Sequence, residues 1–197
     1  MTDLRPGWDA AGAAVVVCDM WDAHHCASAA RRVAEMAPRV NEVVAALRER
    51  DALVVHAPSG CVDFYRDHPA RMRALLAPRA RPPVPIDWQG WEHDEEAALP
   101  ATLTAPGPCS CDSPEPCGEA GPPYPWTRQT PLIGIAPEDA VSDDGGEVFS
   151  LLEHRGIRDV VVMGVHTNIC VLGRPFGIRQ LVKLGMRPVL CRDLTDS

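Results

Sequence analysis

A cysteine at the start of an expected helix is the residue in this sequence best suited to covalent chemistry. The stretch from Val160 to Arg174 reads Val-Val-Val-Met-Gly-Val-His-Thr-Asn-Ile-Cys-Val-Leu-Gly-Arg, which predicts a buried strand, a glycine turn and a helix. With Thr167 or Asn168 as N-cap, Cys170 would lie among unpaired backbone N–H groups that favour a thiolate and can hold an oxyanion. The alternative is that Cys170 is a small apolar side chain packed under the sheet.

A carboxylate ends a second apolar strand. Ala13 to Asp19 reads Ala-Ala-Val-Val-Val-Cys-Asp, the pattern of a buried parallel strand with an acid at its carboxyl end. In open α/β sheets the functional crevice lies outside the carboxyl ends of the strands. We therefore expect Asp19 and Cys170 to face one crevice.

The patterns around these two strands predict strand–helix–strand units, which imply parallel, right-handed pairing. A helical period runs from Ala27 to Arg50, where Pro38 should kink or divide the helix. The other expected elements are a strand at Ala52–His56, a less regular helix at Val62–Leu76, a short helix at Glu147–Arg155, a helix from Cys170 to Leu184 and a strand at Arg187–Cys191.

Residues 78–131 contain more than half of the 20 prolines and show no sustained period. We interpret them as a loop insertion in a single domain of residues 1–197, because they hold too few apolar residues for a core of their own. Trp88, Trp91 and Trp126 favour a partly ordered cover over the crevice. The alternative is disorder.

Two motifs at strand ends carry a family resemblance. Asp19-Met20-Trp21-Asp22 and Gly164-Val165-His166-Thr167-Asn168-Ile169-Cys170-Val171 resemble the isochorismatase-like cysteine hydrolases, which include nicotinamidase and carbamoyl-amide hydrolases. The resemblance implies an α/β fold of three layers, αβα, with a mainly parallel, Rossmann-like sheet. It also implies that Asp19 is the base, that Cys170 is the nucleophile, that the N–H groups of His166 and Cys170 form the oxyanion hole, and that a cis peptide precedes His166.

The sequence departs from this family at the third catalytic residue, a lysine that lies before the cysteine strand. The only lysine here is Lys183, which follows Cys170, and the best match to the missing one is Arg128. An arginine can stabilise a thiolate and bind a substrate oxygen, but it does not release its proton at working pH. Proton transfer would then rest on Asp19. The alternative is that Arg128 is an ordinary surface arginine.

Several aromatic residues are candidates for substrate contact. Trp21, His24 and His56 lie at or near expected strand ends, and Trp126 lies in the proline-rich segment. The alternative for these residues is a packed or hydrogen-bonded structural side chain. Some nicotinamidases bind a metal through an Asp-x-His pair after the second strand, but this pair is absent from His56-Ala57-Pro58. We predict no catalytic metal and no cofactor.

A separate cysteine cluster, Cys109, Cys111 and Cys117, lies within the proline-rich segment. The three thiolates could bind zinc with a fourth ligand such as His93, two could form a loop-closing disulfide, or all could be free thiols. The spacing lacks the paired Cys-x2-Cys pattern of common zinc folds.

Composition favours a small molecule as the partner. The net charge is −8 with no basic patch, which argues against nucleic acid. No signal segment or membrane span is expected, so the cytoplasm is the default location. By the resemblance, a further helix and edge strand are expected after Asp193 but do not follow it in this sequence, and an uncovered edge would favour a homo-oligomer or indicate a fragment.

Together these features predict a cysteine hydrolase that cleaves a small amide or carbamoyl C–N bond through a thioester. The alternative is a catalytically impaired small-molecule-binding or regulatory protein on the same fold, since the family lysine is absent.

Overall fold

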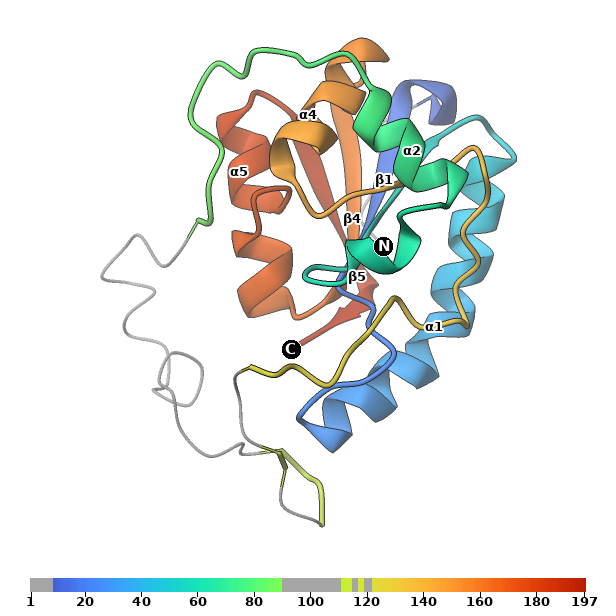
Figure 1. The fold of residues 1–197 in the computed structure, drawn as a ribbon, viewed down its shortest axis with the longest axis vertical. Helices are drawn as coiled ribbons and strands as arrows, with labels where there is room; N and C mark the ends of the chain where they lie inside the picture. The colour runs from blue at the N-terminus through green and yellow to red at the C-terminus, as the bar shows by residue number, and fades with distance from the viewer. Residues whose placement is uncertain (1–8, 90–110, 115–116, 119–121) are drawn as a thin grey trace.

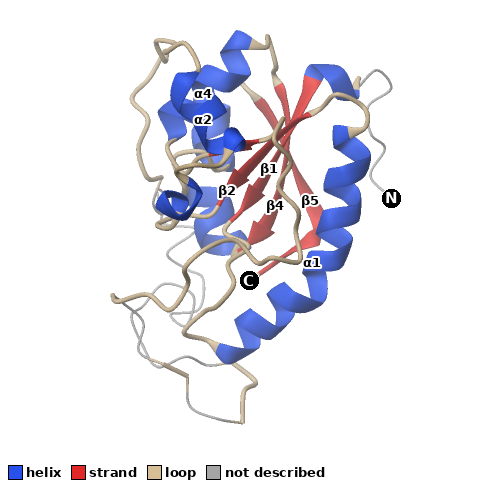
Figure 2. Cartoon of the chain, turned by 45° about the vertical axis from the view of Figure 1, so that its right-hand side comes forward, coloured by secondary structure: helices blue, strands red, loops and turns tan. Residues whose placement is uncertain are grey.

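The computed structural model describes residues 9–89, 111–114, 117–118 and 122–197. Trp91, His93 and Cys109 lie outside the described residues. The centre is a five-stranded parallel sheet in the order β3-β2-β1-β4-β5, and helices cover both of its faces (Figures 1 and 2). The expected three-layer α/β fold is confirmed. The strands are β1 (Ala13–Cys18), β2 (Leu53–Ala57), β3 (Ala140–Val141), β4 (Asp159–Val165) and β5 (Arg187–Asp196).

The two central strands are valine-rich because both of their faces are buried. All six residues of β1 are buried. On one face, Val15 and Val17 pack against α1 (Ala27–Arg48). On the other face, Ala14 and Val16 belong to a core shared with the remaining helices, α2 (Pro69–Leu76), α4 (Gly145–His154) and α5 (Ile178–Lys183). Shorter helical turns are η1 (Ala10–Gly12), η2 (Val62–Tyr65) and the π-helical turn η4 (Thr167–Val171).

The nucleophile helix differs from the sequence expectation. A continuous helix from Cys170 to Leu184 was expected, but the structure has only the turn η4, and α5 begins afresh at Ile178. Pro175 has no N–H to continue a helix, and Gly177 has an extended backbone as the N-cap of α5. These two residues break the helix.

Other expected elements also differ, among them the helix expected at Val62–Leu76, which is divided into η2 and α2. α1 runs undivided over 22 residues although it contains Pro38. β3 was not expected, because two residues are too short to show a period. β5 was expected to end at Cys191 but runs to Asp196, because a shift in register after Val162 lets Gly164 pair with Thr195.

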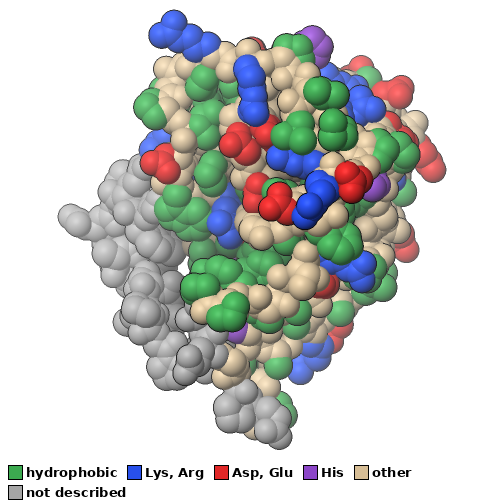
Figure 3. Space-filling view, in the orientation of Figure 1, with side chains coloured by type: hydrophobic (Ala, Val, Ile, Leu, Met, Phe, Trp, Pro, Cys, Tyr) green, Lys and Arg blue, Asp and Glu red, His purple; other side chains and the backbone are tan. Residues whose placement is uncertain are grey.

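Charged side chains on the face formed by α2 and α4 are paired. Arg71 and Arg79 contact Glu147, at 2.5 and 3.2 Å, and Figure 3 shows acidic and basic side chains interspersed on this side of the molecule. In the part of the chain that the structure describes, no helix combines the length and the apolar character needed to cross a bilayer.

A buried polar network joins β2 to α1. Asp139, 1% exposed, accepts hydrogen bonds from Arg48 at 2.7 Å and from His56 Nε2 at 3.1 Å. Burial alone would raise the pKa of Asp139, but hydrogen bonds from His56, Arg48 and the N–H of Ala136 lower it to about 2. The network therefore stabilises the ionised carboxylate.

We expect Asp139→Asn to lower the free energy of unfolding by about 3 kcal/mol at pH 7, because it leaves buried partners without their anion. The folded pKa of about 2 lies below the unfolded value of about 3.9. The stabilisation is thus complete above about pH 5 and is lost as the pH falls through about 2.

Urea unfolding between pH 7 and pH 2 measures this effect, and the difference between wild type and Asp139→Asn should shrink on acidification. Asp159→Asn is the matched control: its partner Arg187 is exposed, so the loss should be about 1 kcal/mol or less. A difference that grows toward low pH would contradict the network's role.

Candidate active site

Asp19 and Cys170 meet at the carboxyl edge of the sheet. β1 and β4 are neighbours in register, with Cys18 opposite Gly164, so the residues that follow them emerge side by side. Asp19 is fully buried, and Cys170 is 5% exposed. The Asp19 carboxylate lies close enough to the Cys170 thiol that its negative charge raises the pKa of that thiol. The structure thus brings together the two residues that the strand-end motifs placed in one crevice.

The Cys170 thiol is protonated at rest. Burial and then the negative charge of Asp19 raise its pKa to about 12, although Arg174 and the N–H of His166 act in the opposite direction. The expectation that the helix start would favour a thiolate is therefore wrong for the resting protein, because burial and the carboxylate outweigh the backbone dipoles. Asp19 is the nearby group that could accept the thiol proton.

The cation beside Asp19 is Arg174. Its Nε donates to Asp19 Oδ2 at 3.0 Å, while Asp19 Oδ1 accepts the N–H of Ser59 at 2.7 Å. Burial alone would lower the pKa of Arg174, but the charges of Asp19 and Cys170 raise it well above its usual value. The guanidinium also lies over the ring of Trp88, 5.2 Å from its centroid.

Arg128, the residue matched to the family lysine, lies elsewhere. Its Nε is 3.9 Å from Asp22 Oδ2 and its side chain is 42% exposed. The guanidinium covers the ring of Phe64 at 5.3 Å. The structure therefore does not place Arg128 against Asp19. The positive charge beside Asp19 comes from Arg174, which the sequence did not lead us to expect. The signal was present in the spacing, since Arg174 follows Cys170 by four residues and its N–H donates to the Cys170 carbonyl at 3.0 Å.

The turn that presents Cys170 has an unusual backbone. The Val165–His166 peptide is cis, which confirms an expectation taken from the resemblance. The carbonyl of His166 accepts the N–H groups of both Ile169 and Val171 at 3.1 Å, so His166 begins the turn in place of Thr167 or Asn168. At Gly164 the backbone approaches Cys18 so closely that a Cβ would lie 2.0 Å from the Cys18 carbonyl oxygen.

Stacked aromatic side chains form one wall beside the cysteine turn. Trp126 stacks on Trp21 with a centroid distance of 4.2 Å, and Tyr124 stacks on Trp126 at 4.4 Å. His24 lies 5.5 Å from Trp126 and 4.9 Å from His166. Three of the four expected substrate-contact residues, Trp21, His24 and Trp126, thus gather next to His166.

Burial favours the neutral form of His24 and His166. Burial, followed by the neighbouring His166 and His25, lowers the pKa of His24 to about 3. Burial also lowers the pKa of His166, against the opposing charges of Asp196 and Asp19. Neutral rings can stack on tryptophan or accept a hydrogen bond, but they add no positive charge.

The fourth expected contact, His56, takes its structural alternative. It is fully buried in β2, with Nδ1 bonded to Gln129 at 3.0 Å and Nε2 to Asp139 at 3.1 Å. Both ring nitrogens are engaged within the core, so the structure does not present His56 to a ligand.

Three further residues belong to the site. The Oγ of Ser59 is buried and has no hydrogen-bond partner within the described chain, and Ser59 follows β2 at the same edge of the sheet. Cys18 lies close enough to Asp19 and Cys170 that their charges, after burial, raise its pKa. Trp88, from the described start of the proline-rich segment, covers Arg174, and the adjacent N–H of Gln89 donates to the Gly173 carbonyl at 2.7 Å.

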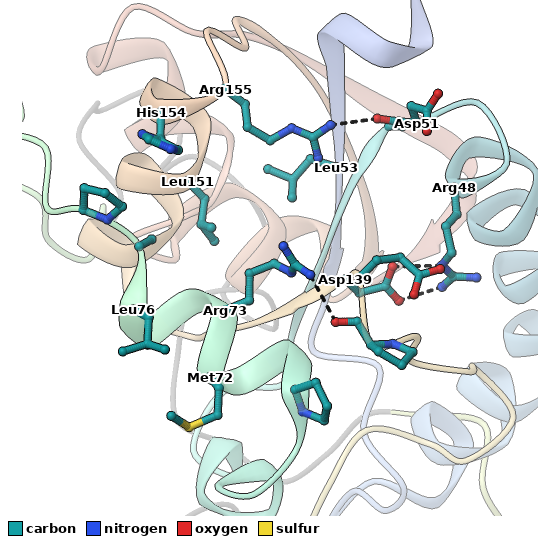
Figure 4. Close-up of a pocket in the computed structure, with 16 residues that line it drawn as sticks. Arg48, Asp51, Leu53, Met72, Arg73, Leu76, Asp139, Leu151, His154 and Arg155 are labelled. Carbon is teal, nitrogen blue, oxygen red and sulfur yellow. Dashed lines mark hydrogen bonds and ion pairs between the residues drawn. The ribbon is translucent and has the colours of Figure 1, made fainter.

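A hollow of about 810 Å³ lies at the opposite edge of the sheet. Figure 4 shows Leu53, at the start of β2, with Met72, Arg73 and Leu151 around it. No cysteine lines this hollow. It is therefore separate from the site at Asp19 and Cys170.

Solved structures show which fold this is. A cysteine hydrolase from Pseudomonas syringae pv. phaseolicola is 15% identical with a TM-score of 0.55, over 100% of this chain and 79% of that one. An isochorismatase family protein from Desulfovibrio vulgaris is 17% identical with a TM-score of 0.51, over 94% and 82%. An isochorismatase from Pseudomonas putida is 12% identical with a TM-score of 0.51, over 96% and 73%.

The chain therefore has the isochorismatase-like fold, as the two strand-end motifs indicated. No protein-family model matches the sequence, and a search of curated protein sequences gave no match.

We expect iodoacetamide to alkylate Cys170 slowly at neutral pH. A thiol pKa of about 12, against about 8.5 for free cysteine, gives a rate lower by roughly 1,000-fold or more at pH 7. The rate should rise with pH beyond pH 9. Asp19→Asn should accelerate it about tenfold, because the variant removes a negative charge that favours the thiol.

Mass spectrometry of the Cys170 peptide after timed alkylation checks this prediction. Asp22→Asn is the control, since Asp22 binds Thr127 rather than the thiol and should leave the rate unchanged. Wild-type Cys170 that reacted faster than free cysteine at pH 7 would contradict the protonated resting state.

Proposed function

We propose that this protein is a cysteine hydrolase that cleaves a small amide or carbamoyl C–N bond through a thioester. The observation that carries the proposal is a buried carboxylate close to both a thiol and an arginine: Asp19 binds Arg174 at 3.0 Å and its charge acts on the Cys170 thiol. The named hydrolases among the solved structures with this fold support it.

In the first half of the reaction, Asp19 accepts the Cys170 proton as the sulfur attacks the substrate carbonyl carbon. A C–S bond forms, and the carbonyl oxygen becomes an oxyanion. The C–N bond then breaks, and Asp19 returns the proton to the leaving nitrogen, so that ammonia or an amine departs. A thioester remains on Cys170.

In the second half, Asp19 takes a proton from a water molecule that attacks the thioester. The C–S bond breaks, the acid product leaves, and the proton passes from Asp19 back to the sulfur. Each turnover consumes one water molecule and restores the thiol. The raised pKa of Cys170 suits this scheme, because proton transfer accompanies attack and no thiolate is needed beforehand.

The negative charge that develops on the substrate oxygen must be stabilised by hydrogen-bond donors. Backbone N–H groups of His166 and Cys170, at the turn that follows the cis peptide, are assigned to the oxyanion hole. Arg174 holds Asp19 in place and offsets the negative charge near the sulfur. It does not transfer a proton, because a guanidinium remains protonated throughout.

The wall of Trp21, Trp126 and His24 suits a small, flat substrate with little charge, which could stack on the indole rings. Simple amides, ureas and carbamoyl compounds have this character. A screen of such compounds for released ammonia is the direct test of the activity.

A binding or regulatory protein on the same fold is the second candidate. The observation in its favour is the engagement of both Asp19 oxygens, one by the N–H of Ser59 and one by Arg174. A carboxylate engaged at both oxygens has fewer free lone pairs to accept the thiol proton. Turnover in the amide screen, lost in Cys170→Ala, would exclude this candidate, whereas ligand binding without turnover would favour it over the hydrolase.

With an amide substrate from that screen, we expect Arg174→Gln to lower kcat/KM by about 100-fold, because charge stabilisation next to the nucleophile is lost. Arg174→Lys should keep at least a tenth of the activity, since a lysine supplies the same charge.

Arg128→Gln is the matched control, because Arg128 pairs with Asp22 at the surface, and its kcat/KM should stay within about threefold of wild type. A large loss in Arg128→Gln with none in Arg174→Gln would reverse this assignment. Folding of every variant is checked by its urea midpoint.

A further inference from the structure

Three cysteine sulfurs converge at the start of α1, apart from the hydrolase site. The Sγ atoms of Cys26, Cys111 and Cys117 all lie within 4.8 Å of one another. Those of Cys111 and Cys117 are 3.3 Å apart, farther than the about 2.05 Å of a disulfide bond. Cys26 is remote in sequence from the other two, so spacing alone did not reveal the group.

The arrangement suits a metal ion. In tetrahedral zinc sites the Zn–S distance is about 2.3 Å, which places the sulfurs about 3.8 Å apart. The separation already present between Cys111 and Cys117 needs only a small adjustment to reach that value. Soft thiolate ligands select zinc, copper(I) or iron–sulfur clusters over harder ions.

The Cys26 sulfur lies at the amino-terminal end of α1. Cys26 is the N-cap of α1, and its Sγ accepts the N–H of Ala29 at 3.4 Å. Backbone N–H donors to ligand sulfurs are typical of the second shell around a metal.

Contacts that need no metal hold the other two cysteines against this helix. Asp112, next to Cys111, accepts a hydrogen bond from Ser28 Oγ at 2.5 Å and forms an ion pair with Arg31 at 3.1 Å. Arg32 lies 3.8 Å from the same carboxylate. Next to Cys117, the N–H of Gly118 donates to the His25 carbonyl at 2.9 Å. Figure 1 shows this segment beside the start of α1.

Charge also balances at this position. Three thiolates and one Zn²⁺ would carry a net charge of −1, and two arginines of the first turns of α1, Arg31 and Arg32, lie 3.1 and 3.8 Å from the carboxylate of Asp112, next to Cys111. A negatively charged metal centre is stabilised by such neighbours.

We propose that Cys26, Cys111 and Cys117 bind a structural zinc ion. The ion ties the proline-rich segment to the start of α1. The chain then continues to Tyr124 and Trp126, which stack in the aromatic wall, so the metal fixes the approach of that wall to the site. This inference does not depend on the proposed hydrolase, because metal binding is measured without any substrate.

The test is the zinc content of the full-length protein, purified under reducing conditions and gel-filtered after exposure to zinc chloride. Wild type should hold about one zinc per chain, with at least three sulfur neighbours at about 2.3 Å by X-ray absorption. Cys26→Ser, Cys111→Ser and Cys117→Ser should each fall below about a fifth of that content. Cys191→Ser, a thiol on β5 away from the cluster, should keep it in full.

Hydrogen exchange gives a second readout, which separates metal binding from a folding defect. Removing zinc from wild type with a chelator should speed exchange of residues 111–126 at least tenfold and leave β1 and β4 protected. Wild type without zinc, or with fewer than two sulfur neighbours around it, would overturn the proposal. A protein mass lower by two hydrogens for each disulfide, found together with no bound metal under the same reducing conditions, would also overturn the proposal.

Discussion

The buried pair of Asp19 and Arg174 is the interaction on which the site depends. Asp19 has no exposed surface, and a lone carboxylate there would be costly to ionise. The arginine Nε and the N–H of Ser59 each bond one of its oxygens. The carboxylate in turn keeps the Cys170 proton in place. Packing of Trp88 on the guanidinium ties the proline-rich segment to the same pair.

This pair also explains why a lysine is not essential to the geometry. A guanidinium offers several donors in a plane, so Arg174 can bond Asp19 and still stack on an indole ring, whereas an ammonium is a point charge. The cation reaches Asp19 from the turn after the nucleophile. The site keeps a carboxylate, a thiol and a positive charge together, although they come from only two stretches of chain.

Much of the central fold could be predicted from the sequence, because buried parallel strands leave unmistakable valine runs at β1 and β4, and carboxyl ends of neighbouring strands share one edge. What could not be predicted depends on long-range geometry. Arg174 was not predicted because the family pattern places the catalytic cation before the cysteine, whereas Arg174 follows it. Cys26 was missed because its partners lie far along the chain, and His56 was misplaced because Asp139 and Gln129, which bury it, come from irregular segments.

The wide separation of the paired residues orders the events of synthesis. Asp19 and Arg174 lie 155 positions apart, and β1 obtains one of its two neighbours only when β4 has been made. As translation proceeds from the amino terminus, β1 can pair with β2 early. The other edge of β1 and the side chain of Asp19 must wait for β4 and Arg174. A nascent chain of this protein therefore exposes an open sheet edge until β4 has left the ribosome.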